Sequence, residues 1–293
     1  MKYLAIIVFA LIALDALAQD NIGQNYTDQD DRFLLGSMGM VIPVYRDFAT
    51  SPLFYRGAGL HGGMGWMRSS DKRERLIDFN INGSLTLART PESDFFPALT
   101  EGFFISINSQ FHYLYKIERF STAKNNFKLG GAIVSTQNIR INPHLENAAV
   151  GLENISNLML VGKLKRDISR TEPKNFKFLF IKTTLQPIRR YLDFQTNIGI
   201  LNFNRRPGYA YVYHNEWDGT DTDPASWVLD AYRWTLNGWR LGTTVEYSWF
   251  RPSGNGRKIS YLWDAAHAPG RFESMQMASH TFRYTIIINN NKR

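Results

Sequence analysis

The stretch IDFNINGSLTLA at residues 77–88 alternates apolar and polar side chains over twelve positions. A period of two is typical of an extended strand that has one apolar face and one wetted face. The stretch FFISINSQFHYLYKI at residues 103–117 continues the alternation for fifteen residues, whereas strands of soluble sheets usually have about five or six. Residues 192–200 and 241–249 repeat the same signature. The sequence therefore predicts an all-β protein with unusually long amphipathic strands.

Turn-forming residues between these stretches predict antiparallel neighbours. Asn237-Gly238 lies between two aromatic, β-branched runs, and this dipeptide suits the two positive-φ positions of a type I′ hairpin turn. Residues 69–72 predict a second, looser hairpin. We expect about twelve strands, within a range of about 10 to 14, and residues 144–152 and 257–263 could add further strands. The predicted strands lie near residues 33–44, 54–68, 75–89, 102–117, 127–140, 155–167, 176–186, 190–203, 208–217, 227–236, 239–250 and 274–289.

The composition of the polar faces separates two architectures, a soluble secreted sandwich or barrel and a transmembrane β-barrel. The lumen of a membrane barrel is lined by polar residues such as Asn, Gln, Ser and Thr with few charges, and aromatic residues form girdles at both membrane interfaces. Both features favour an antiparallel transmembrane β-barrel. The predicted lumen-facing residues are Asp78, Asn80, Asn82, Ser106, Asn108, Gln110 and His112, and the predicted interface-girdle residues are Tyr113, Tyr115, Trp227, Trp234, Tyr247 and Trp249.

The N-terminus has the pattern of a secretory signal peptide. A basic start at Lys2 is followed by an apolar run at residues 3–14 and by the small-residue cleavage motif Ala16-Leu17-Ala18. We expect residues 1–18 to be the signal peptide, residues 19–31 a polar periplasmic lead-in, and residues 32–293 one transmembrane β-barrel domain.

With a leader, long period-two strands and aromatic girdles, the chain resembles outer-membrane β-barrel proteins of Gram-negative bacteria. Its richness in Asn and aromatic residues and the stretch PLFYRG at residues 52–57 resemble barrels of Bacteroidota. Many outer-membrane barrels end on an aromatic residue, whereas this chain continues through Asn289 to Arg293. The resemblance implies a location in the bacterial outer membrane, in contact with lipid and lipopolysaccharide, and it transfers no functional residue.

The composition excludes several classes of protein. The 293 residues contain no cysteine, so disulfide scaffolds, thiol nucleophiles and cysteine-ligated zinc or iron–sulfur sites are excluded. The net charge of +8 is spread along the chain without a polybasic arm, and we expect no nucleic-acid partner. Beyond the first twenty residues, no apolar run reaches the length of a membrane-spanning helix.

Catalytic constellations along single strands are absent from the sequence. Ser279 and His280 are adjacent, so in a strand they point to opposite faces. Ser106 lies six residues from His112, too far along one strand for contact between a nucleophile and its base. His61 lies among the glycines of residues 57–65 and could be a lumen histidine or part of a strand that a ligand approaches. A site assembled from several strands is left open, and lumen hydrogen bonding is the favoured interpretation.

Cofactor and metal motifs are also missing. The glycines of residues 57–65 lack the Lys-Ser/Thr ending of a phosphate-binding loop, and we interpret them as sites of curvature and close backbone approach. The acidic loop at residues 214–223 lacks the twelve-position calcium pattern with its terminal Glu. We therefore expect no cofactor and no metal site.

Three functions are compatible with these patterns. The favoured one is a non-enzymatic barrel that serves as an accessory or structural subunit of an outer-membrane assembly, secretion or uptake complex, with other outer-membrane or periplasmic proteins as partners. The second is a narrow, anion-preferring, porin-like diffusion channel, and the third is an outer-membrane lipid hydrolase. Basic clusters at residues 163–166, 189–190 and 205–206 could line the lumen or bind lipopolysaccharide phosphates at the rim.

Overall fold

The computed structural model describes residues 31–48, 50–89, 99–148, 150–178, 181–185, 187–205, 233–235, 238–269 and 274–291. The predicted signal peptide and nearly all of the lead-in lie outside these residues, as do the predicted strand at 208–217 and the acidic loop at 214–223. No helix among the described residues has the length and hydropathy to cross a membrane.

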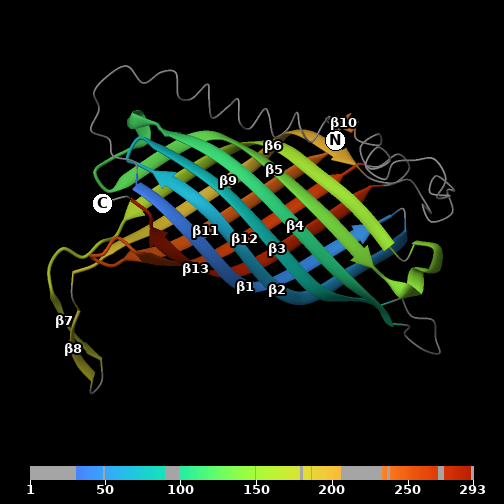
Figure 1. The fold of residues 1–293 in the computed structure, drawn as a ribbon, viewed down its shortest axis with the longest axis horizontal. Coiled ribbons are helices and arrows are strands. Elements are labelled where there is room, and N and C mark those ends of the chain that lie inside the picture. The colour runs from blue at the N-terminus through green and yellow to red at the C-terminus, as the bar shows by residue number, and fades with distance from the viewer. Residues whose placement is uncertain are drawn as a thin grey trace.

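Ten long antiparallel strands close into a barrel, which confirms the predicted fold class and falls at the lower end of the expected strand number (Figure 1). Closure has two seams. The first strand pairs with the last, from Phe33 opposite Asn289 to Asp47 opposite Met275, and β6 pairs with β9 across a long connection. The barrel strands are β1 (Asp31–Asp47), β2 (Ser51–Ser69), β3 (Arg73–Arg89), β4 (Leu99–Lys116), β5 (Asn125–Ile141), β6 (Val150–Asp167), β9 (Arg189–Arg205), β11 (Trp239–Phe250), β12 (Gly256–Ala268) and β13 (Met275–Asn289).

The structure corrects the predicted strand at residues 176–186 and shows what the two optional segments form. The segment predicted at residues 176–186 forms a separate hairpin, β7 (Lys174–Phe178) with β8 (Ile181–Leu185), which pairs outside the barrel sheet and projects beyond the barrel end (Figure 1). The optional segment at 257–263 belongs to β12, a full wall strand. The other optional segment, 144–152, holds the short 3-10 helix η2 (Pro143–Ala148) and the start of β6. A second short 3-10 helix, η1 (Glu118–Phe120), follows β4.

The predicted hairpin at Asn237-Gly238 is wrong. β10 (Arg233–Thr235) and β11 both pair with β9, at Asn202 to Asn204 and at Arg189 to Ile198 respectively. Because β6 pairs with the other edge of β9 from Tyr191 to Arg205, β10 and β11 share one edge. β10 and β11 therefore lie one after the other along the same edge of β9 and are not the paired strands of a hairpin.

The period-two pattern places apolar side chains outside the barrel and polar ones inside. On β3, Leu85 is 70% exposed and Ile81 54% exposed, whereas Ser84 and Thr86 between and beside them are buried. A closed barrel satisfies its backbone hydrogen bonds within the wall, so this apolar exterior can face lipid without unpaired backbone groups.

The ten-strand ring puts both of its ends at one side of the barrel. We call this side the terminal rim; it holds Asp31, Asn289 and the start of the connection to the β7–β8 hairpin. The opposite rim holds Asp47 and Met275. Buried aromatic and apolar side chains occupy the lumen at both rims, with Tyr45, Tyr55 and Phe104 at the opposite rim.

Candidate functional site

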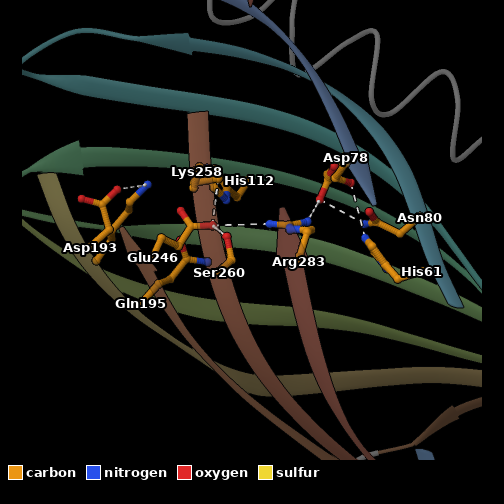
Figure 2. A network of polar contacts seen from close by, with 12 residues as sticks. His61, Asp78, Asn80, His112, Asp193, Gln195, Glu246, Lys258, Ser260 and Arg283 are labelled. Atoms are coloured by element: carbon orange, nitrogen blue, oxygen red, sulfur yellow. Dashed lines mark hydrogen bonds and ion pairs between the residues drawn. The ribbon is translucent and has the colours of Figure 1, made fainter. Parts of the chain in front are cut away.

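The lumen holds, from its middle to the terminal rim, a set of buried charged side chains that eight wall strands supply. Each occupies an inward position of its strand, and charges are buried in proteins only when they are paired and hydrogen-bonded, because their desolvation is costly. We call this set the lumen charge network (Figure 2). Its members are Glu74, Asp78, His112, Lys128, Lys163, Asp193, Glu246, Lys258 and Arg283.

Glu74 is the acceptor at one centre of the lumen charge network. Its Oε1 accepts a hydrogen bond from Lys163 Nζ at 2.6 Å and lies 3.2 Å from His112 Nε2. Lys128 Nζ lies 4.0 Å from Oε2 of the same carboxylate, and Lys163 Nζ lies 3.6 Å from Asp193 Oδ2. Glu74 thus faces two buried ammonium groups, and it shares one of them, Lys163, with Asp193.

Glu246 and Asp78 form the second centre, joined by Arg283. Glu246 Oε1 accepts hydrogen bonds from Lys258 Nζ at 2.8 Å and Ser260 Oγ at 3.0 Å. Arg283 approaches the same oxygen with Nη2 at 3.4 Å and donates from Nη1 to Asp78 Oδ2 at 3.1 Å (Figure 2). The guanidinium therefore links carboxylates of β11 and β3 across the lumen.

These contacts cross the lumen instead of following the wall. In the ring of strands, β3 lies three places from both β6 and β13, yet Glu74 reaches Lys163 and Asp78 reaches Arg283. Arg240 on β11 likewise donates to Thr136 Oγ1 on β5 at 2.9 Å while its other nitrogens form a forked pair with Asp264. Asn138 on β5 contacts Met277 Sδ on the diametrically opposite strand β13 at 3.4 Å.

A small cavity lies between these groups. Its volume is about 110 Å³, enough for several water molecules by the usual measure of about 10–15 Å³ each. The charged groups that line it balance, with four carboxylates against four cationic groups besides His112. The lining charges are Glu74, Asp78, Glu246, Asp264, Lys163, Lys258, Arg240 and Arg283.

Packed side chains occupy the lumen on both sides of the cavity, toward the opposite rim and toward the terminal rim. At the opposite rim, Tyr45 stacks between Tyr55 and Phe104, with ring centroids 5.1 and 4.8 Å apart. Arg140 lies beside them and pairs with Asp47 at 2.5 Å and with Glu153. At the terminal rim, Phe250 contacts Phe33 and Tyr191 with centroids 6.0 and 5.9 Å apart. The cavity therefore lies between two groups of packed side chains, one toward each rim.

The predicted lumen-facing residues lie as follows. Asp78 and His112 belong to the lumen charge network, and Asn80 donates to Asp78 Oδ2 at 3.0 Å. Asn108 and Gln110 line the cavity with them. Ser106 is buried, and Asn82 bonds to His61.

Four of the six predicted girdle residues lie close together in pairs at the terminal rim. Tyr115 donates to Tyr113 Oη at 2.6 Å, and Tyr247 lies against Trp249 with ring centroids 5.5 Å apart. Both pairs are on outward positions near strand ends. Trp227 and the side chain of Trp234 lie outside what the structure describes.

No metal centre is assembled among the described residues, where no group of three or more His, Cys, Asp or Glu side chains is placed to hold an ion. The network carboxylates are instead directed at lysine and arginine side chains.

Sequence reasoning missed most of the lumen charge network and one further constellation. Glu74, Lys163, Glu246 and Arg283 stand at inward positions of their strands, so a search for charges at inward positions would have found them. The sequence alone did not show which of these charged side chains pair with one another. The sequence also did not show the contact between Ser37 and His61, which lie on neighbouring strands. His280, by contrast, bonds to Tyr261 Oη at 2.7 Å.

Comparison with known proteins gives fold likenesses of very low identity. No model of a protein family matches the chain, and no curated protein matches it. Among solved structures, the outer membrane protease OmpT from Escherichia coli is 5% identical, with 92% of this chain and 99% of that chain covered at a TM-score of 0.44. The Pseudomonas putida toluene transporter TodX is 7% identical, with 88% and 89% covered at a TM-score of 0.27.

The translocator domain of autotransporter NalP from Neisseria meningitidis is 10% identical, with 97% of both chains covered at a TM-score of 0.23. A protease, a transporter and a translocator thus occur among barrels that this chain resembles weakly. These likenesses assign no functional residue and no activity to this chain.

Proposed function

We propose that this protein is a non-conducting β-barrel of the bacterial outer membrane that serves as an accessory or structural subunit of a larger membrane complex. The apolar exterior supports the membrane location, since outward residues such as Leu60 and Leu85 are 73% and 70% exposed and suit contact with lipid. The resemblance to barrels of Bacteroidota rests only on the richness in Asn and aromatic residues and on the stretch at residues 52–57. The observation that carries the proposal is the filled lumen.

Ion pairs and aromatic packing occupy much of the lumen of the described barrel and narrow it. Arg283 connects β13 to β3 in the middle of the lumen, and the stacked rings of Tyr45 and Phe104 block the opposite rim. An anion-preferring channel would need an excess of positive charge along its lumen, whereas the charges around the cavity balance. These features favour the structural role over the channel.

We expect the purified barrel to be electrically silent in a planar lipid bilayer. Its folding is checked by heat-modifiable migration on a gel, and an open porin reconstituted in the same way is the positive control. The physical reason is that ions cannot pass the paired charges without breaking them. A steady, anion-selective current from the folded protein would contradict the proposal.

The β7–β8 hairpin supports a role in a complex because it extends beyond the wall at the terminal rim, where its two strands pair with each other. Replacing residues 174–185 by a short Gly-Ser linker should leave a heat-modifiable barrel, since these residues add no strand to the ring. Crosslinking in native membranes followed by affinity purification should recover a stable partner with the intact protein and lose it with the variant. Recovery of the intact barrel alone would contradict the accessory role.

A further inference from the structure

Three polar side chains from adjacent strands meet inside the lumen. Ser37 lies on β1, His61 on β2 and Asn82 on β3, and none of them belongs to the lumen charge network. His61 Nδ1 lies 2.8 Å from Asn82 Oδ1, and His61 Nε2 lies 3.4 Å from Ser37 Oγ. The imidazole is 7% exposed, so both of its nitrogens have protein partners in a sheltered position.

These contacts determine which nitrogen of the imidazole carries the proton. An amide oxygen only accepts hydrogen bonds, so Nδ1 must be the N–H that donates to Asn82. Neutral Nε2 then presents its lone pair to the Ser37 hydroxyl, which donates to it. This is the order of orienting group, base and nucleophile that activates a serine for attack on a carbonyl.

The strand register builds this arrangement. His61 pairs directly with Gly39 on one side and with Asn82 on the other, while Ser37 pairs with Gly63. A Cβ at Gly63 would lie 2.8 Å from Ser37 Oγ and 2.2 Å from Asn80 Oδ1. Glycine at this position therefore makes room for the serine hydroxyl and for the amide of Asn80.

The constellation faces the lumen, and residues close to it on the same strands line the cavity, although Ser37, His61 and Asn82 do not. Leu35, two residues before Ser37 on the same face, lines the cavity, as do Asp78 and Asn80 on the strand that carries Asn82. Figure 2 shows His61 next to Asn80 and Asp78, with Arg283 nearby. The N–H groups of Asn80 and Arg283 in this region donate to the Asp78 carboxylate.

The buried histidine of the lumen charge network, His112, shows the contrast. His112 Nε2 faces the Glu74 carboxylate at 3.2 Å, and its Nδ1 has no hydrogen-bond partner among the described residues. His112 thus joins a carboxylate and leaves its second nitrogen unused, whereas His61 connects an amide oxygen to a hydroxyl.

We propose that Ser37, His61 and Asn82 form an acyl-transfer site that hydrolyses carboxylic esters, with Ser37 as nucleophile, His61 as general base and Asn82 as positioning residue. This activity goes beyond the structural role proposed above and departs from the expectation of a non-enzymatic barrel. It also differs from the lipid hydrolase considered from the sequence, because its three residues face the lumen and not the surrounding lipid.

The reaction balances with water as the only second reactant. Ser37 Oγ bonds to the ester carbonyl carbon as its proton passes to His61 Nε2; the carbon–oxygen bond to the alcohol then breaks, and the alcohol leaves with that proton. Water next attacks the acylated serine and gives a proton to His61, the acid departs, and the proton returns to Ser37 Oγ. The net change converts ester and water to acid and alcohol.

The test is covalent labelling of the full-length folded barrel with a small alkyl fluorophosphonate, read by intact mass and peptide mapping. We expect one phosphonyl group per protein, mapped to Ser37, and no label on Ser37→Ala. The control is Ser84→Ala, which removes another inward serine whose hydroxyl donates to the Phe104 carbonyl at 3.1 Å; it should label like the parent. Heat-modifiable migration shows that each variant is folded.

The roles of the other two residues are tested by labelling rates. His61→Gln should slow labelling by about 10²-fold or more, as loss of a general base does. Asn82→Ala should slow it by roughly 10²-fold through misplacement of the imidazole, and Asn82→Asp, which keeps an acceptor for Nδ1, should restore most of the rate. A structural role for Asn82 would not produce this rescue.

Folded parent protein that gains no label, or label on a residue other than Ser37, would overturn the proposal. So would equal labelling rates in the parent and His61→Gln. These outcomes are separate from those that test the structural role, because neither bilayer conductance nor partner recovery depends on the reactivity of Ser37.

Discussion

Replacing Glu74 by glutamine should lower the free energy of unfolding of the barrel by about 3–5 kcal/mol, the usual cost of removing one partner from a buried ion pair. The carboxylate is 3% exposed and pairs with Lys163, which is 7% exposed at its side chain. Lys128 is buried on the other oxygen. After the substitution both ammonium groups would stay in the lumen, with Asp193 as the carboxylate nearest to Lys163.

The measurement is a urea titration of the protein folded into lipid vesicles, followed by heat-modifiable migration and by tryptophan fluorescence. A matched control is Glu118→Gln, which removes an exposed carboxylate 3.1 Å from Lys116 at the terminal rim. Exposed pairs contribute about 0–1 kcal/mol, so this variant should unfold close to the parent. If Glu74→Gln lost no more than Glu118→Gln, the lumen charge network would not stabilise the barrel.

Replacing Gly57 by alanine should cost about 3 kcal/mol, at the upper end of the range for forced overpacking. A Cβ at this position would lie 1.8 Å from the Leu85 carbonyl oxygen and 2.8 Å from Thr86 Cα. Both are backbone atoms of the paired strand β3, so no side-chain rotation can relieve the overlap and the two strands must separate locally.

The matched control for Gly57→Ala lies on the same strand at the outer face. A Cβ at Gly62 would meet only Ile81 Cγ2, at 4.0 Å, so Gly62→Ala should be neutral within about 0.5 kcal/mol. The same vesicle titration compares the two variants. Equal stability of both would show that the glycines of residues 57–65 are not needed for the close approach of β2 and β3.

Much of the wall could be predicted from the sequence because one face of each strand is apolar and the other polar. Residues 77–88 indicated β3 together with the direction of each side chain, and residues 103–117 did the same for β4. A strand that contacts lipid on one face carries this information locally, in every second residue. No knowledge of its neighbours is needed.

Features that depend on the register between distant strands could not be predicted in this way. Glu74 and Lys163 are 89 residues apart, and their contact follows from the stagger of the whole ring. The turn preference of Asn237-Gly238 gave a wrong prediction for a related reason. The segments on both sides of this dipeptide pair with one edge of β9, and this pairing overrides the local preference. The Ser37–His61 contact was missed because nucleophile and base were sought along one strand, while they lie on two.

The even number of wall strands determines which chain segments share a compartment. An epitope tag placed before Asp31 and another placed after Asn289 would be reached by antibody from the same side of the membrane, together with tags at residues 70–72 and 251–255. A tag in the connection between β3 and β4 would be reached only from the other side. Immunostaining of intact and permeabilised cells with this tag set would therefore orient the whole molecule, and two tags would suffice to do so.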